Sequence, residues 1–130
     1  MLEKLRRLSL AMSGLTFAVI AIGATFAPKL VAQNYALTLN GVDGLNQFRA
    51  IFMGFWASLA YAMITAARKP ERIMLGDVCG VMLLLQALGR AVSMVVDGVP
   101  SLQFVGAFLG ELLMAVLVLL PRATRGRTKA

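Results

Sequence analysis

The sequence predicts an all-α protein, a bundle of four transmembrane helices with both termini in the cytoplasm. Hydrophobic residues make up 59% of the 130 residues and charged residues only 15%, whereas a soluble domain is about 45–50% apolar and about 25% charged. Four apolar stretches are each long enough for a span of ~20 residues, and Lys and Arg gather on one side of them. We therefore expect a single integral membrane domain over residues 1–130, with short connections between its spans.

The first span is expected at about 8–27, where 20 consecutive residues carry no charge. A basic start precedes this stretch, so a cleaved signal peptide is the competing interpretation. The apolar stretch exceeds the length of about 7–15 residues that is usual for a signal peptide, and Pro28 follows the would-be cleavage site. We expect the segment to be retained as a membrane-spanning helix.

A surface excursion separates the first span from the second. Its turn residues enclose a short mixed segment at 30–39, and they are Pro28, Asn34, Asn40-Gly41 and Asp43-Gly44. The second span is expected at about 45–67, with Asn46 and Arg49 in its first turn. A polar hairpin over 68–72 then returns the chain to the membrane.

The third and fourth spans are expected at about 73–96 and 102–120. Asp77, Gln86 and Arg90 interrupt the third span, which ends at the Gly/Pro turn over 97–100. The fourth span carries Glu111 near its middle and is closed by Pro121. Both spans thus place ionisable side chains at a depth where the bilayer is apolar.

The distribution of Lys and Arg predicts the orientation, because cytoplasmic loops carry the excess of positive charge. Lys29 lies on one side of the spans, and ten such residues lie on the other: Lys4, Arg6, Arg7, Arg68, Lys69, Arg72, Arg122, Arg125, Arg127 and Lys129. We therefore expect a multi-pass membrane protein with cytoplasmic N and C termini. This distribution explains the net charge of +7 without nucleic acid, since no soluble basic face with aromatic side chains is present.

The absence of His and the single Cys79 exclude much catalytic and metal chemistry. Imidazole ligands, Ser-His triads and His proton shuttles are impossible. One cysteine forms neither an internal disulfide nor a cysteine-based zinc or iron–sulfur site. We expect no metal and no cofactor, and the residue types lean against an enzyme. Cys79 is interpreted as a small buried hydrophobic side chain.

Charged residues inside the spans are the informative ones, because a charge at the bilayer centre costs at least ~2.5–3.5 kcal/mol. At a rise of about 1.5 Å per residue, Glu111 lies ~13 Å from the outer end of its span and Arg90 ~10 Å from Asp97. Arg49 lies ~6 Å deep from the same side. Polar groups of three helices therefore overlap in depth, and we expect them to be partners.

Helical spacing assigns these polar residues to three faces that we expect to converge. Positions 86, 90, 93 and 97 share a face of the third helix, positions 46, 49 and 53 a face of the second, and positions 103, 107, 111 and 114 a face of the fourth. The hypothesis is a charge-paired core of Arg90 and Glu111 that opens toward the non-cytoplasmic side. Its candidate site residues are Asn46, Arg49, Gln86, Arg90, Ser93, Asp97 and Glu111.

Two interpretations of this polar core stay open at the level of the sequence. Polar side chains between membrane helices can serve packing alone, at about 0.6 kcal/mol each. Alternatively, they can line a pocket for a lipid headgroup, a quinone or a small polar substrate.

We expect an ion pair near the cytoplasmic end and close helix packing at two small-residue stripes. Asp77 lies one turn inside its span and is expected to form an ion pair with Arg72 or Arg68. Small-residue stripes at 76–80 and 106–110 have the Gly-x-x-x-Gly spacing, which allows close backbone approach. We expect these stripes to pack within the chain rather than in a dimer, and the oligomeric state stays open.

The pattern resembles a known family of membrane proteins. Asn46-x-x-Arg49-Ala50 with Gly54, then Gly89-Arg90-x-x-Ser93-x-x-x-Asp97-Gly98-x-Pro100, and then Glu111 are similar to the pattern of the domain of unknown function 4345 family. The resemblance covers about residues 8–120, and the stretch at 89–100 is its most specific part. It implies a small bacterial four-helix protein of the inner membrane with cytoplasmic termini, similar to the DoxX-like group. Because DoxX-like proteins are linked with respiratory or redox membrane systems, the resemblance suggests a quinone or a redox partner.

Two functional hypotheses follow from the sequence. The leading one is an accessory or ligand-binding membrane protein whose outer polar pocket recognises a lipid, a quinone or a larger membrane protein complex, with Arg49 and Arg90 as fork-shaped donors and Glu111 as the compensating charge. The alternative is a small proton-coupled transporter that uses Glu111. Against the transporter, the first span carries no charged residue and Glu111 has arginine partners available.

Overall fold

The computed structural model describes residues 1–127, with side chains described as far as Pro121. Its elements are α1 (Leu2–Phe26), α2 (Pro28–Asn34), α3 (Gly41–Phe48), the π-helix η1 (Arg49–Phe55), α4 (Trp56–Arg68), α5 (Ile73–Val96) and α6 (Leu102–Arg127). Over these described residues no strand is formed, so the all-α prediction is confirmed.

Four helical segments of the described chain are long and apolar enough to cross a membrane. They are Leu2–Phe26, Gly41–Arg68, Ile73–Val96 and Leu102–Pro121, the second being α3, η1 and α4 in one continuous run. Many large apolar side chains face outward, as Tyr61 at 74% and Val95 at 86% exposure illustrate. Such a surface suits the acyl chains of a bilayer, and the prediction of four membrane-spanning helices is confirmed.

Several helix ends differ from the predicted spans. Helix α1 begins at Leu2 rather than at 8, and the predicted excursion contains the short helix α2. Helix α6 continues beyond Pro121 to Arg127, although an end at 120 was expected. A proline inside a helix removes one backbone donor and can kink the helix rather than end it.

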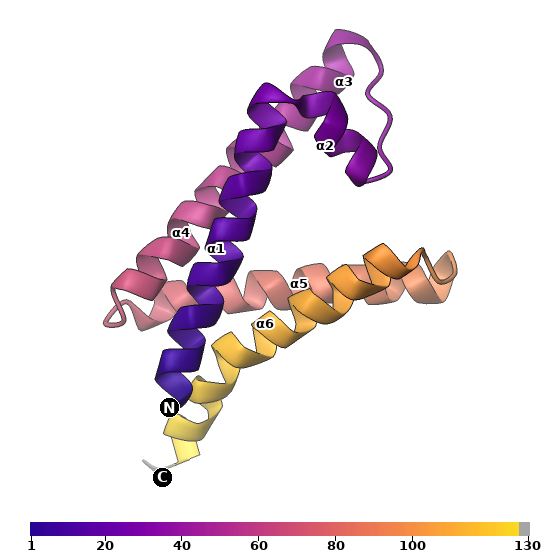
Figure 1. The fold of residues 1–130 in the computed structure, drawn as a ribbon. Coiled ribbons are helices and arrows are strands. Elements are labelled where there is room, and N and C mark those ends of the chain that lie inside the picture. The colour runs from indigo at the N-terminus through magenta and orange to yellow at the C-terminus, as the bar shows by residue number, and fades with distance from the viewer. Residues whose placement is uncertain (128–130) are drawn as a thin grey trace.

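The long helices form two legs of an open V (Figure 1). Helix α1 packs along α4 and η1 as one leg, and α5 packs along α6 as the other. The legs join near the two termini, where α1 also contacts α6 and α4 contacts α5, and they diverge toward the end that carries α2 and α3. The expected bundle is therefore closed at one end and splayed at the other.

The main core lies where the two legs join. Leu10, Met63, Cys79 and Val118 are fully buried there, one from each long helical segment. Close packing depends on Gly80, because a Cβ atom at this position would lie 2.7 Å from Cδ2 of Leu119. The stripe at 76–80 thus packs within the chain as expected, and so does the buried Cys79.

The second small-residue stripe, at 106–110, does not pack against another helix of the described chain. A Cβ atom added at Gly106 or Gly110 would meet no atom within 4 Å among the described residues. These two positions therefore face open space rather than a packed helix.

An ion pair connects the first helix to the third span near the termini. Nη2 of Arg6 lies 2.9 Å from Oδ1 of Asp77 and donates a hydrogen bond of 3.0 Å to the carbonyl oxygen of Ile73. Nε of Arg7 donates a hydrogen bond of 2.9 Å to the carbonyl oxygen of Ala67. The expected ion pair of Asp77 is present, but its partner comes from α1.

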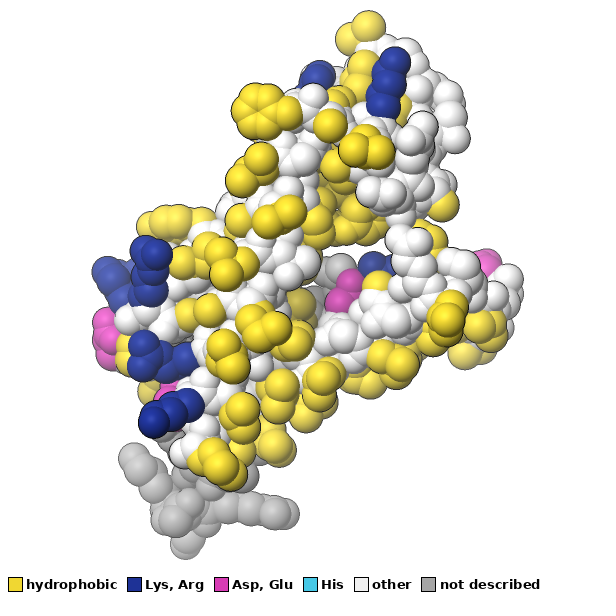
Figure 2. Space-filling model, viewed as in Figure 1, with side chains coloured by type: hydrophobic (Ala, Val, Ile, Leu, Met, Phe, Trp, Pro, Cys, Tyr) yellow, Lys and Arg dark blue, Asp and Glu magenta, His cyan; other side chains and the backbone are white. Residues whose placement is uncertain are grey.

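Arg72 and Arg68 were therefore the wrong partners for Asp77. Both are exposed at the α4–α5 turn, whereas Arg6 is only 5% exposed. The guanidinium of Arg6 reaches Asp77 because α1 places it over Gly76, where a glycine leaves room. In Figure 2 several basic side chains gather at this end of the molecule, and others lie at the far end of the α1–α4 leg. The side chains of residues 122–130, four of which entered the charge count, lie outside the described side chains.

Candidate functional site

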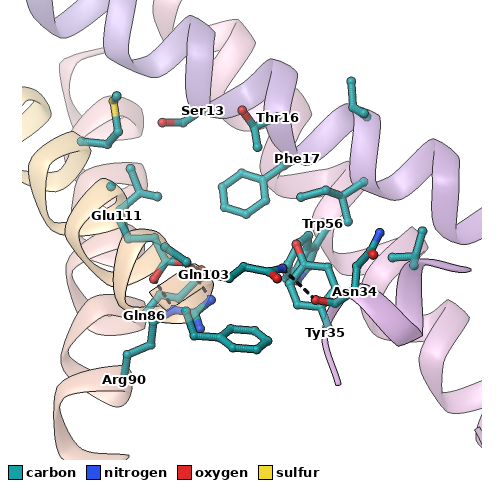
Figure 3. Close-up of a pocket in the computed structure, with 18 of the residues that line it drawn as sticks. Ser13, Thr16, Phe17, Asn34, Tyr35, Trp56, Gln86, Arg90, Gln103 and Glu111 are labelled. Carbon is teal, nitrogen blue, oxygen red and sulfur yellow. Dashed lines mark hydrogen bonds and ion pairs between the residues drawn. The ribbon is translucent and has the colours of Figure 1, made fainter. Parts of the chain in front are cut away.

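A large cavity of the described chain lies between the two legs of the V. Its volume is about 620 Å³, within the range of about 300–1,000 Å³ that is common for sites of small molecules. The walls come from α1, α2 and α4 on one side and from α5 and α6 on the other. Figure 2 shows the hollow, with acidic and basic side chains inside it, and Figure 3 shows its lining. We call it the interleg pocket.

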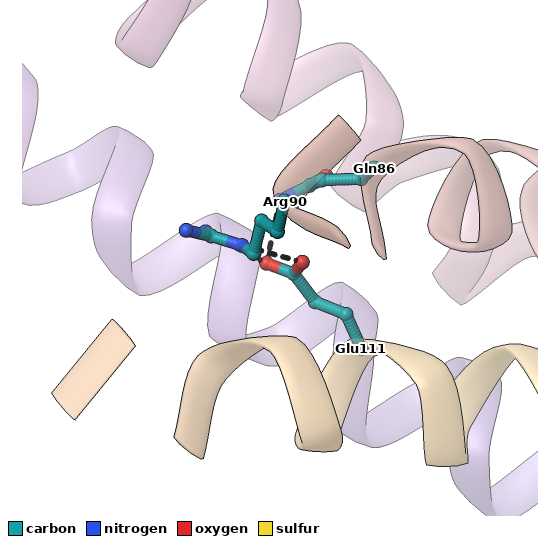
Figure 4. A network of polar contacts seen from close by, with 3 residues as sticks. All are labelled: Gln86, Arg90 and Glu111. Carbon is teal, nitrogen blue, oxygen red and sulfur yellow. Dashed lines mark hydrogen bonds and ion pairs between the residues drawn. The ribbon is translucent and has the colours of Figure 1, made fainter. Parts of the chain in front are cut away.

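The polar wall of the interleg pocket is a network of three side chains (Figure 4). Arg90 donates to Glu111 twice, from Nε to Oε2 at 2.8 Å and from Nη2 to Oε1 at 3.0 Å. Nε2 of Gln86 donates to the same Oε1 at 2.7 Å. The side chains of Arg90 and Glu111 are 24% and 15% exposed. The bidentate geometry is the strong form of an Arg–carboxylate pair, and it leaves the network with no net charge.

The opposite wall is aromatic. Trp56 makes edge contacts with Phe17 and Tyr35, at centroid distances of 5.1 and 5.5 Å, which is a favourable geometry for aromatic pairs. Burial raises the pKa of the Tyr35 phenol, and the smaller influences of Arg90, which lowers this pKa, and Glu111, which raises it, oppose each other. Tyr35 is therefore a neutral hydroxyl at physiological pH.

The π-helix η1 helps to align this aromatic wall. Its i→i+5 hydrogen bonds widen the turn, so successive residues are separated by a smaller angle around the helix axis than in an α-helix. Phe48 stacks on Phe52 at 4.3 Å, and Phe52 lies 4.7 Å from Trp56, so these three rings form a continuous row along the helix. π-Helical turns occur frequently at functional sites.

One hydrogen bond crosses the mouth of the interleg pocket. Nε2 of Gln103 on α6 donates to the carbonyl oxygen of Asn34 at the end of α2, at 3.1 Å. Figure 3 shows this contact between the polar side and the aromatic side of the pocket. It links the two legs at a place where their backbones have already diverged.

The structure brings together three of the seven predicted site residues. Gln86, Arg90 and Glu111 line the interleg pocket, and so does the whole predicted face of the fourth span at positions 103, 107, 111 and 114. Ser93 donates to Asp97 at 2.9 Å on the exposed surface of α5, and neither residue lines the pocket.

Asn46 and Arg49 do not reach the site. Both are exposed, on α3 and at the start of η1, and neither lines the interleg pocket. The expected convergence of three faces is wrong for the second span because α3 and η1 pack against α1 and α2, on the leg that diverges from α5 and α6. Arg90 therefore finds its counter-charge on one neighbouring helix alone.

Sequence reasoning missed the aromatic side of the pocket. Tyr35 lies in the excursion that was interpreted as surface, and Phe17 and Trp56 lie inside the first and second predicted spans, where neither was assigned to a site. The available signal was the single Trp of the chain at mid-span together with a Tyr beside a turn, since such side chains combine an apolar ring with a polar handle.

The described residues contain no group of three or more His, Cys, Asp or Glu side chains that could hold a metal ion. What the interleg pocket offers is recognition chemistry: hydrogen-bond donors on one wall, aromatic faces on the other and aliphatic side chains between them. Fold and pocket together define a small multi-pass membrane protein built from two helical legs.

The comparison with protein families gives the particular family. The family model described as "Domain of unknown function (DUF4345)" matches residues 5–121, which is most of the chain. The protein belongs to this family, as its sequence pattern suggested. Comparison with curated proteins found no match, and comparison with solved structures found none.

Proposed function

We propose that this protein binds a lipid-soluble molecule, a membrane lipid or a quinone, in the interleg pocket. The observation that carries this proposal is the arrangement of the pocket, where a hydrogen-bonding cluster centred on Arg90 faces the rings of Phe17, Tyr35 and Trp56 across an apolar floor. A site of this composition fits a molecule with a polar head and an apolar body. Packing alone leaves unexplained why a cavity of about 620 Å³ stays open beside the ion pair.

In this role the protein acts as a ligand-binding or accessory component of a bacterial inner-membrane system. The basic end then faces the cytoplasm, because cytoplasmic segments carry the excess of Lys and Arg. The interleg pocket lies in the halves of the spans away from that end, so this orientation would put it in the outer half of the membrane.

The geometry favours ligand recognition over proton-coupled transport by Glu111. A coupling carboxylate must accept and release a proton during each cycle, whereas Glu111 accepts three hydrogen bonds from Arg90 and Gln86. Loss of the negative charge at Glu111 would leave the guanidinium uncompensated in the membrane.

The test is native mass spectrometry of the protein after gentle solubilisation, compared with a variant whose pocket is filled. Gly110 lines the interleg pocket and its Cβ position is free, so Gly110→Leu fills the cavity without a clash with the backbone. Gly106→Leu is the matched control, because Gly106 is equally open on the same helix but does not line the pocket. We expect a bound small molecule in the wild type and the control and its loss in Gly110→Leu. Equal occupancy in all three proteins contradicts the proposal.

A further inference from the structure

The charge balance of the interleg pocket narrows the class of ligand, on the assumption that the proposed binding function holds. Arg90 and Glu111 are the charged side chains that line the pocket in the described chain. Their bidentate contact places one positive and one negative group within 2.8 Å of each other. An approaching anion is attracted by one and repelled by the other, so little electrostatic gain offsets the cost of taking its charge out of water.

Two hydrogen-bond donors beside the ion pair remain available in the pocket. Nη1 of Arg90 makes no hydrogen bond with any described residue, because Nε and Nη2 supply both contacts to Glu111. Figure 4 shows the outer end of this guanidinium extending beyond the carboxylate. The hydroxyl of Tyr35 also has no hydrogen-bond partner within the described part of the chain, although its ring is packed against Trp56. Donors that line a mostly apolar cavity can form hydrogen bonds with an acceptor that enters it.

We infer that the interleg pocket selects an uncharged ligand head with carbonyl-type acceptors, and that Glu111 sets this selectivity by cancelling the charge of Arg90. Ester carbonyls of a neutral glycerolipid and ring carbonyls of a quinone share this chemistry. The rings of Tyr35 and Trp56 flank the head, and side chains such as Ile20, Leu83 and Met114 contact the tail. An anionic phospholipid headgroup is disfavoured, although an arginine is the residue that would ordinarily bind it.

Trp56 is the single tryptophan of the chain and lines the pocket, so its fluorescence reports occupancy directly. The protein in detergent micelles is titrated with diacylglycerol and with phosphatidylglycerol that carry the same brominated acyl chains, since bromine quenches the indole. We expect saturable quenching by the neutral probe at a concentration about tenfold below that for the anionic probe, a ratio that corresponds to a modest electrostatic difference. Competition by unbrominated diacylglycerol or by a decyl-substituted benzoquinone distinguishes the two sources of carbonyl acceptors.

The Glu111→Gln variant tests the role of the carboxylate. It keeps a side chain that can hydrogen-bond to Arg90 and Gln86 but leaves the guanidinium charge uncompensated. We expect its preference to invert toward phosphatidylglycerol by about tenfold. The matched control is the double variant Arg90→Gln/Glu111→Gln, which is again neutral and should bind the anionic probe no better than the wild type does.

The outcomes separate the selectivity from the binding function. Equal or tighter binding of phosphatidylglycerol by the wild type overturns the inference about the ligand head while the pocket stands, and so does an unchanged preference in Glu111→Gln. Quenching that does not saturate with either probe and is unaffected by Gly110→Leu overturns the binding function itself. The wild-type comparison decides the preference alone if Glu111→Gln fails to fold.

Discussion

Glu111 accepts two hydrogen bonds from the guanidinium of Arg90, with Nε at 2.8 Å from Oε2 and Nη2 at 3.0 Å from Oε1. The two residues come from α5 and α6, which form one leg of the V. The pair thus joins two helices on one side of the interleg pocket, and the other leg contributes no charge to it in the described residues.

Removal of one member of this pair should destabilise the protein strongly. Arg90→Leu leaves the Glu111 carboxylate, 15% exposed, without its counter-charge, and loss of this part-buried pair should cost about 1–3 kcal/mol. The double variant Arg90→Leu/Glu111→Leu should recover most of the loss. Thermal unfolding in detergent, followed by circular dichroism, measures both effects in a double-mutant cycle. Additive losses in the double variant would show that the pair is not coupled.

Gly76→Ala should destabilise the junction of the two legs. The new Cβ would collide with Nη2 of Arg6, which is held by Asp77 and by the Ile73 carbonyl. Displacement of that buried guanidinium, or overpacking around it, costs about 1–3 kcal/mol.

The matched control for this substitution lies on the same helix. Gly89→Ala adds a methyl group that meets no described atom within 4 Å, so the helix propensity of alanine should stabilise by up to about 1 kcal/mol. Unfolding midpoints of the two variants measured side by side decide the point. Similar midpoints for both would contradict the contact between Arg6 and Gly76.

Tyr35 should titrate above the usual tyrosine range of about pH 10. A Tyr61→Phe background leaves Tyr35 as the sole tyrosine, and absorbance at 295 nm follows its ionisation. Burial is the main cause of the raised pKa, Arg90 lowers it and Glu111 raises it. Replacing Arg90 by Gln should therefore raise the midpoint further, and replacing Glu111 by Gln should lower it.

The raised pKa of Tyr35 should make the free energy of unfolding fall at high pH. The folded-state pKa of Tyr35 lies above that of the unfolded chain, so its stabilising contribution is complete below about pH 10 and is lost as the pH rises through the folded-state value. A single-tyrosine protein whose absorbance midpoint lies at or below that of free tyrosine is incompatible with a buried phenol.

The orientation of the chain can be tested with single cysteines in a Cys79→Ser background. Lys69 and Val99 are exposed at the α4–α5 turn and the α5–α6 turn, which lie at opposite ends of α5. We expect a membrane-impermeant maleimide to label Val99→Cys in intact cells and Lys69→Cys only after permeabilisation, because the basic end should be cytoplasmic. The reverse labelling pattern would place the termini outside.

The sequence predicted which residues share a helix face, and this was enough to pair Arg90 with Glu111. Consecutive antiparallel helices with a short connection are neighbours, so polar groups at equal depth on α5 and α6 meet. The face at positions 103, 107, 111 and 114 was identified for the same reason, because helical periodicity depends only on local geometry.

The sequence did not predict which helices pack against one another, and this packing determines the partners of several polar residues. Periodicity does not say which helix covers a given face, so Arg49 was grouped with Arg90 although its segment belongs to the other leg. The partner of Asp77 was sought in the nearest turn, whereas Arg6 reaches it from a helix 67 residues or more away along the chain, as the Arg6 bond to Ile73 illustrates. Tyr35 gained its place only because α2 packs against α1 and brings the residue that follows it into the interleg pocket.

The divergence of the legs also determines how occupancy of the interleg pocket would be controlled. Because the hollow lies between helices that are apolar enough to span a membrane, its proposed ligand would enter by lateral diffusion in the plane of the bilayer. A hydrophobic molecule can then exchange without ever dissolving in water, and the governing quantity is its mole fraction among the surrounding lipids rather than its aqueous concentration. Half-saturation should accordingly shift when inert lipid dilutes the ligand within the bilayer at constant total amounts of protein and ligand.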